Sequence, residues 1–152
     1  MYYNDIEIAQ MTINDFESIK DILISDFDDF WNLDIMKEEL QSENSHYFVA
    51  RIDNKIVGFA GIKVILDEAD VMNIVTRKDS RKHGVGSSLL NAIIIYATNS
   101  GIEKLTLEVN EQNTTAIHLY EKFGFNKIAL RKNYYNNIDT AIIMQLMLTK
   151  KS

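Results

Sequence analysis

The residues of this 152-residue sequence that are best suited to chemistry form a short loop that could bind an anion. Gly84 and Gly86 stand two positions apart, directly before a segment whose apolar residues have helical spacing. Residues 77–83 carry four cations and one acid, a net charge of +3 in a protein whose net charge is −6. The first turn of a helix has unpaired N–H groups and a partial positive charge, so glycines there let a phosphate approach the backbone closely. Ser87 and Ser88 add hydroxyl groups to the expected first turn.

Two common phosphate-binding motifs do not fit this loop. The Walker A motif needs Gly-Lys followed by Ser or Thr after its first glycine and four further residues, and that sequence is absent here. The dinucleotide motif needs a third glycine where this chain has Leu89. The glycines therefore indicate either a phosphate-binding loop of another kind or a tight turn with a purely structural role.

Two further side chains could transfer protons. Glu108 lies on the polar face of a strict alternation over residues 104–110, and Tyr120 follows within a segment of helical spacing. By pattern alone, Glu108 could be an ordinary surface carboxylate and Tyr120 a core residue with a satisfied hydroxyl. His83 and His118 are the other titratable candidates, but three scattered histidines do not predict a metal site.

The elements that must position these residues alternate between strands and helices. Apolar residues recur along one helical face from Leu89 to Ala97, and Gly101 is a plausible end for that helix. The other expected elements are strands at 2–10, 46–52, 56–66, 70–76, 104–110, 125–135 and 140–148, and helices at 15–27, 35–43 and 113–123, the first capped by Thr12 or Asn14. This order predicts a mixed α+β fold and argues against a regular repeat of βαβ units.

Length and composition restrict the class of protein. The chain has the size of one domain, and the absence of cysteine excludes disulfides, a thiolate zinc site and a cysteine nucleophile. We expect a cytoplasmic protein without a signal peptide or membrane span, because the longest apolar run, residues 92–97, is too short to cross a bilayer. Residues 1–48 carry twelve acids and two lysines, whereas the remainder has a net charge of +4. Acidic helices of this kind either solvate the surface or attract a cationic partner.

The loop resembles a signature of the GCN5-related N-acetyltransferase (GNAT) family. Arg81-Lys82-His83-Gly84-Val85-Gly86 matches the pattern Arg/Gln-x-x-Gly-x-Gly/Ala in full. The resemblance implies acetyl-CoA as cosubstrate, no metal, and one domain over residues 1–152. It also implies a twisted, mixed and mostly antiparallel sheet of about six or seven strands flanked by about four helices.

The resemblance also implies roles for individual residues. Glu108 corresponds to a general base and Tyr120 to a general acid, while Tyr134 and Tyr135 correspond to residues that hold the acceptor backbone. From the sequence alone, these two tyrosines could equally be aromatic residues at a strand end. The residues implied to bind the cosubstrate are Ile74, Val75, Arg81, His83, Gly84, Val85, Gly86, Ser87, Asn113 and Tyr120. The residues implied to bind the acceptor are Trp31, Asn73, Tyr134 and Tyr135.

Within the family, four segments resemble the members that acetylate the N-terminal alanine of a bacterial ribosomal protein. They are residues 66–75, 107–128, 131–135 and 141–144. The implied partner is the basic N-terminal tail of a ribosomal protein, which could be attracted by Asp26, Asp28, Asp29 and Asp34. We expect no direct nucleic-acid or membrane partner. We also expect the protein to be a monomer or a weak dimer. The segment at 136–141 departs from the pattern: it is short, lacks glycine and has Asp139-Thr140 where Glu-Asp is common. A small amine, another protein N-terminus, or a non-catalytic acyl-CoA-binding role therefore stay open.

Overall fold

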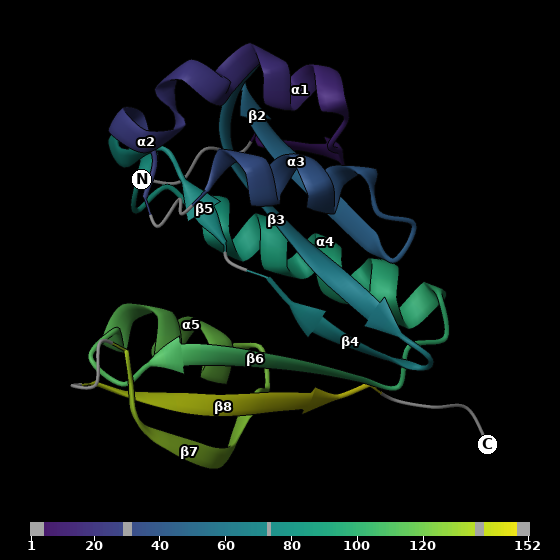
Figure 1. Cartoon of the computed structure of the whole chain (residues 1–152), viewed down its shortest axis with the longest axis vertical. Coiled ribbons are helices and arrows are strands. Elements are labelled where there is room, and N and C mark those ends of the chain that lie inside the picture. The colour runs from purple at the N-terminus through teal and green to yellow at the C-terminus, as the bar shows by residue number, and fades with distance from the viewer. Residues whose placement is uncertain (1–4, 29–31, 73, 136–138, 149–152) are drawn as a thin grey trace. The chain divides into compact units, whose positions relative to one another are not determined.

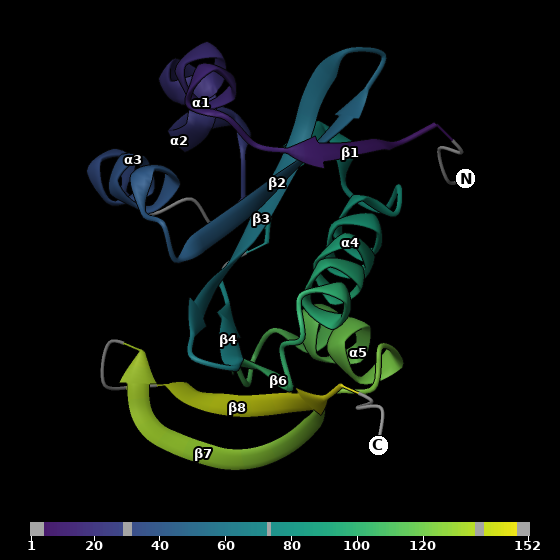
Figure 2. The same cartoon turned by 90° about the vertical axis from the view of Figure 1, so that its right-hand side faces the viewer.

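The computed structural model describes residues 5–28, 32–72, 74–135 and 139–148, with the side chains of residues 133–135 left aside. The chain divides into two compact units (Figures 1 and 2). The first comprises Met1–Val64 and Met72–Tyr96, and the second comprises Ile65–Val71 and Ala97–Ser152. The described residues form eight strands, and within the two units β4 pairs with β6 in parallel whereas the other pairings are antiparallel. The expected mixed, mostly antiparallel α+β fold is confirmed.

The first unit is built on an antiparallel hairpin. Strands β2 (Ser45–Ile52) and β3 (Lys55–Ile65) are joined by Asp53 and Asn54, whose φ angles of 51° and 66° are those of a tight hairpin turn. Strand β1 (Glu7–Gln10) pairs with the outer side of β2, and the two-residue strand β5 (Val75–Thr76) pairs with β3. The expected edge strand in 2–10 is thus present from Glu7 onward.

Helices lie on both faces of this hairpin. Figure 2 shows α1 (Ile13–Ile19), α2 (Leu23–Asp26) and α3 (Leu33–Gln41) on one side of β2 and β3, with α4 (Val85–Asn99) on the other. The alternation of β2 explains this arrangement, because successive side chains of a strand point to opposite faces. Tyr47 and Val49 belong to the core on the α1–α3 side, whereas His46 and Phe48 contact Tyr96 of α4.

The first helical region differs from the single helix expected at 15–27. Thr12 caps it as predicted, with a reciprocal capping box to Asp15, and the apolar stripe of Phe16, Ile19, Leu23 and Phe27 is buried. The helix is nevertheless interrupted by a 3-10 turn at Lys20–Ile22, because Ile19 and Ile22 adopt φ angles of −119° and −113°. Both are β-branched residues, which fit an α-helix less well than unbranched ones. The next helix, α3, begins at Leu33 after the cap Asn32, slightly earlier than expected.

The prediction of a single strand at 70–76 was wrong. The chain there forms two short strands: β4 (Glu68–Val71), which belongs to the second unit, and β5, which belongs to the first. Gly58 and Phe59 of β3 pair with β5, whereas Glu68, Ala69 and Asp70 of β4 pair with β6. Sequence patterning could not reveal the division, because Glu68 and Asp70 are disfavoured in strands by propensity, and β4 depends on its pairing with β6.

The second unit is a four-stranded sheet with one helix. Its order is β4–β6–β8–β7, with β6 at Lys104–Asn110, β8 at Asp139–Met147 and β7 at Asn126–Tyr135 (Figure 1). Leu105, Leu107 and Val109 are buried, as the alternation predicts. Helix α5 (Thr114–Lys122) ends before Gly124, whose φ of 100° favours glycine. No helix within the described ranges is long and apolar enough to cross a membrane.

Candidate functional site

The glycine loop lies at the N-terminus of a long helix, as the sequence predicts. After β5 the chain forms a 3-10 turn at Lys78–Ser80 and reaches Gly84, whose φ of 84° lies in the left-handed region. Helix α4 begins at the next residue, and Ser88 N donates to Gly84 O at 3.0 Å. The N–H groups of Val85, Gly86 and Ser87 are therefore first-turn donors, which have no carbonyl partner within the helix. This arrangement fits a diphosphate.

A residue that the sequence analysis missed lets this loop lie close to the hairpin. A Cβ atom at Gly58 of β3 would lie 2.8 Å from the carbonyl oxygen of Val75 and 2.8 Å from a methyl group of Val85. Any larger residue would push β5 or the start of α4 away. A glycine inside an apolar strand was the available signal, because such a residue often marks the close approach of another backbone.

The cations of the loop are less available than their charge suggests. Arg77 is 9% exposed, and its Nε donates to the carbonyl of Ile56 at 3.2 Å. Its Nη1 lies 3.6 Å from Asp26, and its guanidinium lies 4.9 Å from the ring centre of Phe27. Arg81 makes an ion pair with Asp28. Much of the local positive charge is thus neutralised within the protein, which leaves the backbone N–H groups as the main candidates for holding a phosphate.

The same pairs correct the expectation about the acidic first third of the chain. Of the four aspartates expected to attract a basic partner, Asp26 and Asp28 are already paired with arginines of the loop. Asp34 is exposed at the first turn of α3 and has no ion pair among the residues that the structure describes. Asp29 lies outside the described residues. Asp26 and Asp28 therefore have less charge available for a basic partner, and the attraction by the four residues stays a prediction.

The candidate acid and base both lie in the second unit. Glu108 is on the exposed face of β6, and its carboxylate lies 3.3 Å from the guanidinium of Arg131 on β7. Tyr120 of α5 is 9% exposed and packs against Phe125, with ring centres 5.8 Å apart. Asn113 caps α5, because its Oδ1 accepts a hydrogen bond from Ala116 N at 3.1 Å. Its side-chain oxygen already has a structural partner, which the sequence analysis did not anticipate.

The structure groups the other predicted residues as follows. The first unit brings together Ile74, Val75, Arg81, His83, Gly84, Val85, Gly86 and Ser87. The second unit holds Glu108, Asn113 and Tyr120, together with the end of β7, where the backbones of Tyr134 and Tyr135 lie. The predicted acceptor residues Trp31 and Asn73, and the side chains of the two tyrosines, lie outside the described part of the chain. Within the described ranges, no group of three or more His, Asp or Glu side chains could hold a metal ion.

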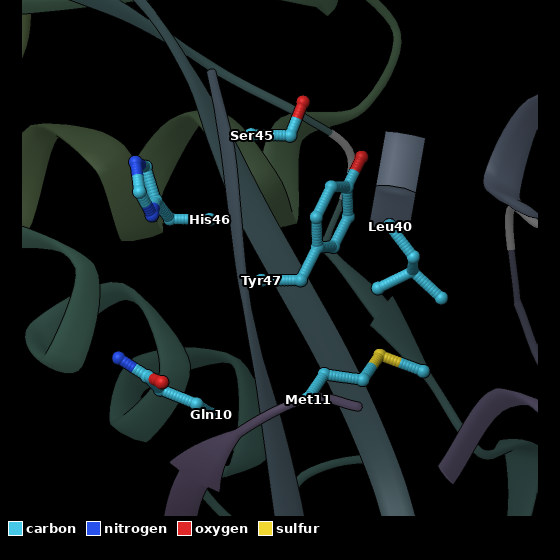
Figure 3. Close-up of a pocket in the computed structure, with 6 residues that line it drawn as sticks. All are labelled: Gln10, Met11, Leu40, Ser45, His46 and Tyr47. Carbon is cyan, nitrogen blue, oxygen red and sulfur yellow. The ribbon is translucent and has the colours of Figure 1, made fainter. Parts of the chain in front are cut away.

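A separate pocket in the first unit contains none of the predicted site residues. It has a volume of about 100 Å³ and lies where β1 ends beside β2 (Figure 3). Its lining consists of Gln10, Met11, Leu40, Ser45, His46 and Tyr47. Burial raises the pKa of the Tyr47 hydroxyl, and the neighbouring charge of Glu39 raises it further. The Ser45 hydroxyl has no hydrogen-bond partner among the described residues.

Comparisons with known proteins agree with the geometry of the loop. The sequence profile of the acetyltransferase (GNAT) family matches residues 16–125. The chain is similar to a ribosomal protein bS18-alanine N-acetyltransferase of Escherichia coli strain K12, with 39% identity over 109 residues that cover 70% of this chain and 74% of that protein.

Solved structures agree over nearly the whole length. The crystal structure of the ribosomal-protein-S18-alanine N-acetyltransferase from Escherichia coli matches with a TM-score of 0.88 and 31% identity, covering 97% of this chain and 96% of that one. A GNAT family acetyltransferase from Elizabethkingia anophelis, crystallised with acetyl-CoA bound, matches with a TM-score of 0.78 and 23% identity, covering 96% of this chain and 100% of that one. The second likeness concerns the fold alone.

Proposed function

Since this chain belongs to the acetyltransferase (GNAT) family, we propose that it transfers the acetyl group of acetyl-CoA to the N-terminal alanine of a small-subunit ribosomal protein. One observation carries the proposal: the signature Arg81–Gly86 ends at the first turn of α4, in a chain 39% identical to an enzyme named for acetylating the alanine of ribosomal protein bS18. We propose that the two units act as one acetyltransferase domain over residues 1–152, because the family profile runs through both.

The cosubstrate would be held mainly by the backbone of the first unit. The N–H groups from Gly84 to Ser87 would bind the diphosphate of acetyl-CoA, since they lie at the N-terminus of α4, where N–H groups have no carbonyl partner within the helix. Ile74 and Val75 would lie beside the pantetheine arm, and the Val75 N–H would polarise the thioester carbonyl as an oxyanion donor. We also assign cosubstrate contacts to Arg81, His83 and Asn113.

Acetyl transfer needs a deprotonated amine and a proton for the departing thiolate. We assign the first task to Glu108, acting through a water molecule, and the second to Tyr120. Direct attack of the amine on the thioester then breaks the carbon–sulfur bond, while the amine proton passes toward Glu108 and the thiolate takes the Tyr120 proton. The exposure of Glu108 on β6 supports access from solvent, and the burial of Tyr120 supports a proton donor screened from bulk water.

The acceptor class follows from the basicity of amines. An α-amine has a pKa of about 7.7–8.0, so an appreciable fraction is already deprotonated near neutral pH, whereas a lysine at about 10.4 is charged. A surface carboxylate such as Glu108 is therefore better matched to an N-terminus than to a lysine side chain. Trp31, Asn73, Tyr134 and Tyr135 are proposed to bind the acceptor, and the exposed Asp34 to attract its basic tail in the cytoplasm.

The test is an acceptor series. The protein is incubated with acetyl-CoA and a peptide that starts with free Ala-Arg, with the same peptide blocked at its N-terminus, and with a lysine-containing blocked peptide. Mass spectrometry then locates the acetyl group. We expect acetylation at the free N-terminal alanine alone.

Three other outcomes would contradict the proposal. Modification of lysine would assign a different acceptor. Transfer to small amines but not to the peptide would favour a small-molecule enzyme. Binding of acetyl-CoA without turnover on any acceptor would favour a non-catalytic binding module.

A further inference from the structure

The segment that follows α2 is joined through its backbone to the strand that leads into the glycine loop. Phe27 and Arg77 form an antiparallel β-bridge, although fifty positions separate them in the sequence. Asp28 N donates to the carbonyl of Thr76 at 2.8 Å. Phe27 and Asp28 therefore act as a short additional strand beside the end of β5, and all of these residues belong to the first unit.

The core fixes the position of this segment. Phe27 is 2% exposed and its ring lies 6.2 Å from that of the fully buried Phe59. The guanidinium of Arg77 lies over the Phe27 ring and also contacts Asp26 and the carbonyl of Ile56. Because a buried aromatic side chain and a buried arginine hold it on both sides, the next residue, Asp28, has a well-defined place beside the loop.

Asp28 binds the loop through Arg81. The Arg81 Nε donates to one carboxylate oxygen of Asp28 at 2.6 Å, and Nη2 contacts the other oxygen. This two-point geometry restricts an arginine side chain more than a single contact does. Arg81 immediately precedes Lys82 and stands three residues before Gly84. The φ angles of Lys82 and Gly84 are 64° and 84°, so the loop has two left-handed residues close together. The contact with Asp28 therefore ties the start of this loop to the segment that follows α2.

The exposure of the pair indicates what it can affect. The side chains of Arg81 and Asp28 are 55% and 23% exposed, and ion pairs near solvent contribute little to global stability. The pair should therefore affect how well the loop is ordered, and it should have little effect on the free energy of unfolding of the protein. Because binding a ligand to a loop requires that the loop be ordered, any restraint present before binding improves affinity.

We propose that Asp28 is a positioning residue for the acetyl-CoA loop: it holds Arg81 and thereby orders the first-turn N–H groups of α4 for the diphosphate. This inference rests on the proposed function, because it assumes that acetyl-CoA is the ligand of the loop. It assigns Asp28, which the sequence analysis placed with the acceptor, to the cosubstrate side of the reaction.

The experiment is a double-mutant cycle measured by calorimetric titration of CoA. The proteins are wild type, Asp28→Ala, Arg81→Ala, the double variant, and Asp28→Glu. Glu17→Ala is the matched control, because Glu17 makes a similarly exposed ion pair with Lys20 elsewhere in the first unit, at 2.7 Å. We expect Asp28→Ala to weaken CoA binding roughly threefold to tenfold, and the double variant to bind no worse than Arg81→Ala alone. Asp28→Glu should recover part of the loss, and Glu17→Ala should bind as wild type does.

Steady-state kinetics supply a second readout. In Asp28→Ala the KM for acetyl-CoA should rise while kcat and the KM for the acceptor peptide stay near wild type, and the thermal midpoint should not move. A Kd for CoA that is unchanged or lower in Asp28→Ala overturns the inference, and so do additive effects of the two single substitutions. Wild-type protein that binds CoA but acetylates no N-terminus refutes the proposed function and leaves the coupling measurable. Wild-type protein that binds no CoA refutes both.

Discussion

Glu108 on β6 and Arg131 on β7 form an ion pair, with 3.3 Å between the carboxylate Oε1 and the guanidinium Nη1. Strand β8 lies between the two strands, so the pair reaches across the exposed face of the sheet. Arg131 thus places a positive charge beside the carboxylate of the proposed base. At 34% exposure, the Glu108 side chain also stays accessible to a water molecule that could relay the proton.

We therefore predict that Glu108→Gln removes most of the activity while acetyl-CoA binding persists. Glutamine keeps the size of the side chain and loses the proton acceptor, so kcat should fall by about 10²–10⁴-fold. Glu121→Gln, an exposed position on α5, is the control and should keep wild-type kcat. Turnover of an N-terminal peptide and calorimetric binding of CoA measure the two effects. Equal kcat in Glu108→Gln and wild type would exclude Glu108 as the base.

Tyr120→Phe should distinguish the two possible roles of Tyr120, as a proton donor and as a packing residue of the core. The phenyl ring retains the packing on Phe125, so the free energy of unfolding should change by less than about 1 kcal/mol. Loss of the hydroxyl should lower kcat by about 10²-fold or more if Tyr120 protonates the thiolate. Tyr96→Phe on α4 is a matched control, since Tyr96 packs on His46 with ring centres 5.0 Å apart. A variant that keeps full turnover would leave Tyr120 with a packing role only.

Gly84→Ala should lower both the stability of the protein and its affinity for acetyl-CoA. At a φ of 84°, an alanine costs about 1–2 kcal/mol of stability, because its Cβ approaches the following carbonyl. Gly101→Ala provides the comparison: Gly101 has a φ of 77°, and nothing would contact the added Cβ within 4 Å. Both variants should lose similar stability in urea unfolding, but only Gly84→Ala should bind CoA more weakly. Equal CoA affinities for the two variants would argue against the loop as the diphosphate site.

Tyr47→Phe should make the protein less sensitive to alkaline pH. Burial and the charge of Glu39 hold the pKa of Tyr47 well above its ordinary value of 10.0. Above pH about 10 the unfolded chain releases this proton while the folded protein keeps it, so stability falls as pH rises, and below that pH the group has no such effect. The phenylalanine variant lacks this loss. At neutral pH it should lose at most about 1.5–3 kcal/mol, because the hydroxyl interacts with the carboxylate of Glu39.

Urea unfolding of both proteins at pH about 8 and about 10.5 tests this prediction. The stability difference between the two pH values should be smaller for Tyr47→Phe than for wild type. Tyr96→Phe, on the half-buried face of α4, should behave as wild type does. An identical pH dependence in wild type and Tyr47→Phe would mean that the hydroxyl is not held in its protonated form.

Local patterns predicted most of the elements correctly. The alternation over residues 104–110 gave β6 with its buried and exposed faces, and the helical spacing from Leu89 to Ala97 gave α4. The signature at Arg81–Gly86 indicated the family, which the profile match confirms. These features depend on the conformational preferences of neighbouring residues and on a fixed period, so they can be read along the chain.

The errors arose where the outcome depended on partners far away in sequence. The strand expected at 70–76 became two short strands, of which β4 pairs with β6 and β5 pairs with Gly58 and Phe59 of β3. The helix expected at 15–27 is interrupted at Lys20–Ile22 although its apolar stripe is correct. Gly58 appeared to be an ordinary strand residue until Val75 and Val85 were found against it.

The sequence by itself determined the family, the order of most of the elements, and the presence of a glycine loop before a helix, because each depends on short-range spacing. Only the tertiary structure decided which charges are available to a ligand. Asp28 and Arg81 are 53 positions apart, and no periodicity relates them. Their pairing depends on the burial of Phe27 and on the β-bridge to Arg77, which is the physical reason why an acidic segment that seemed ready for a basic partner instead supports the loop.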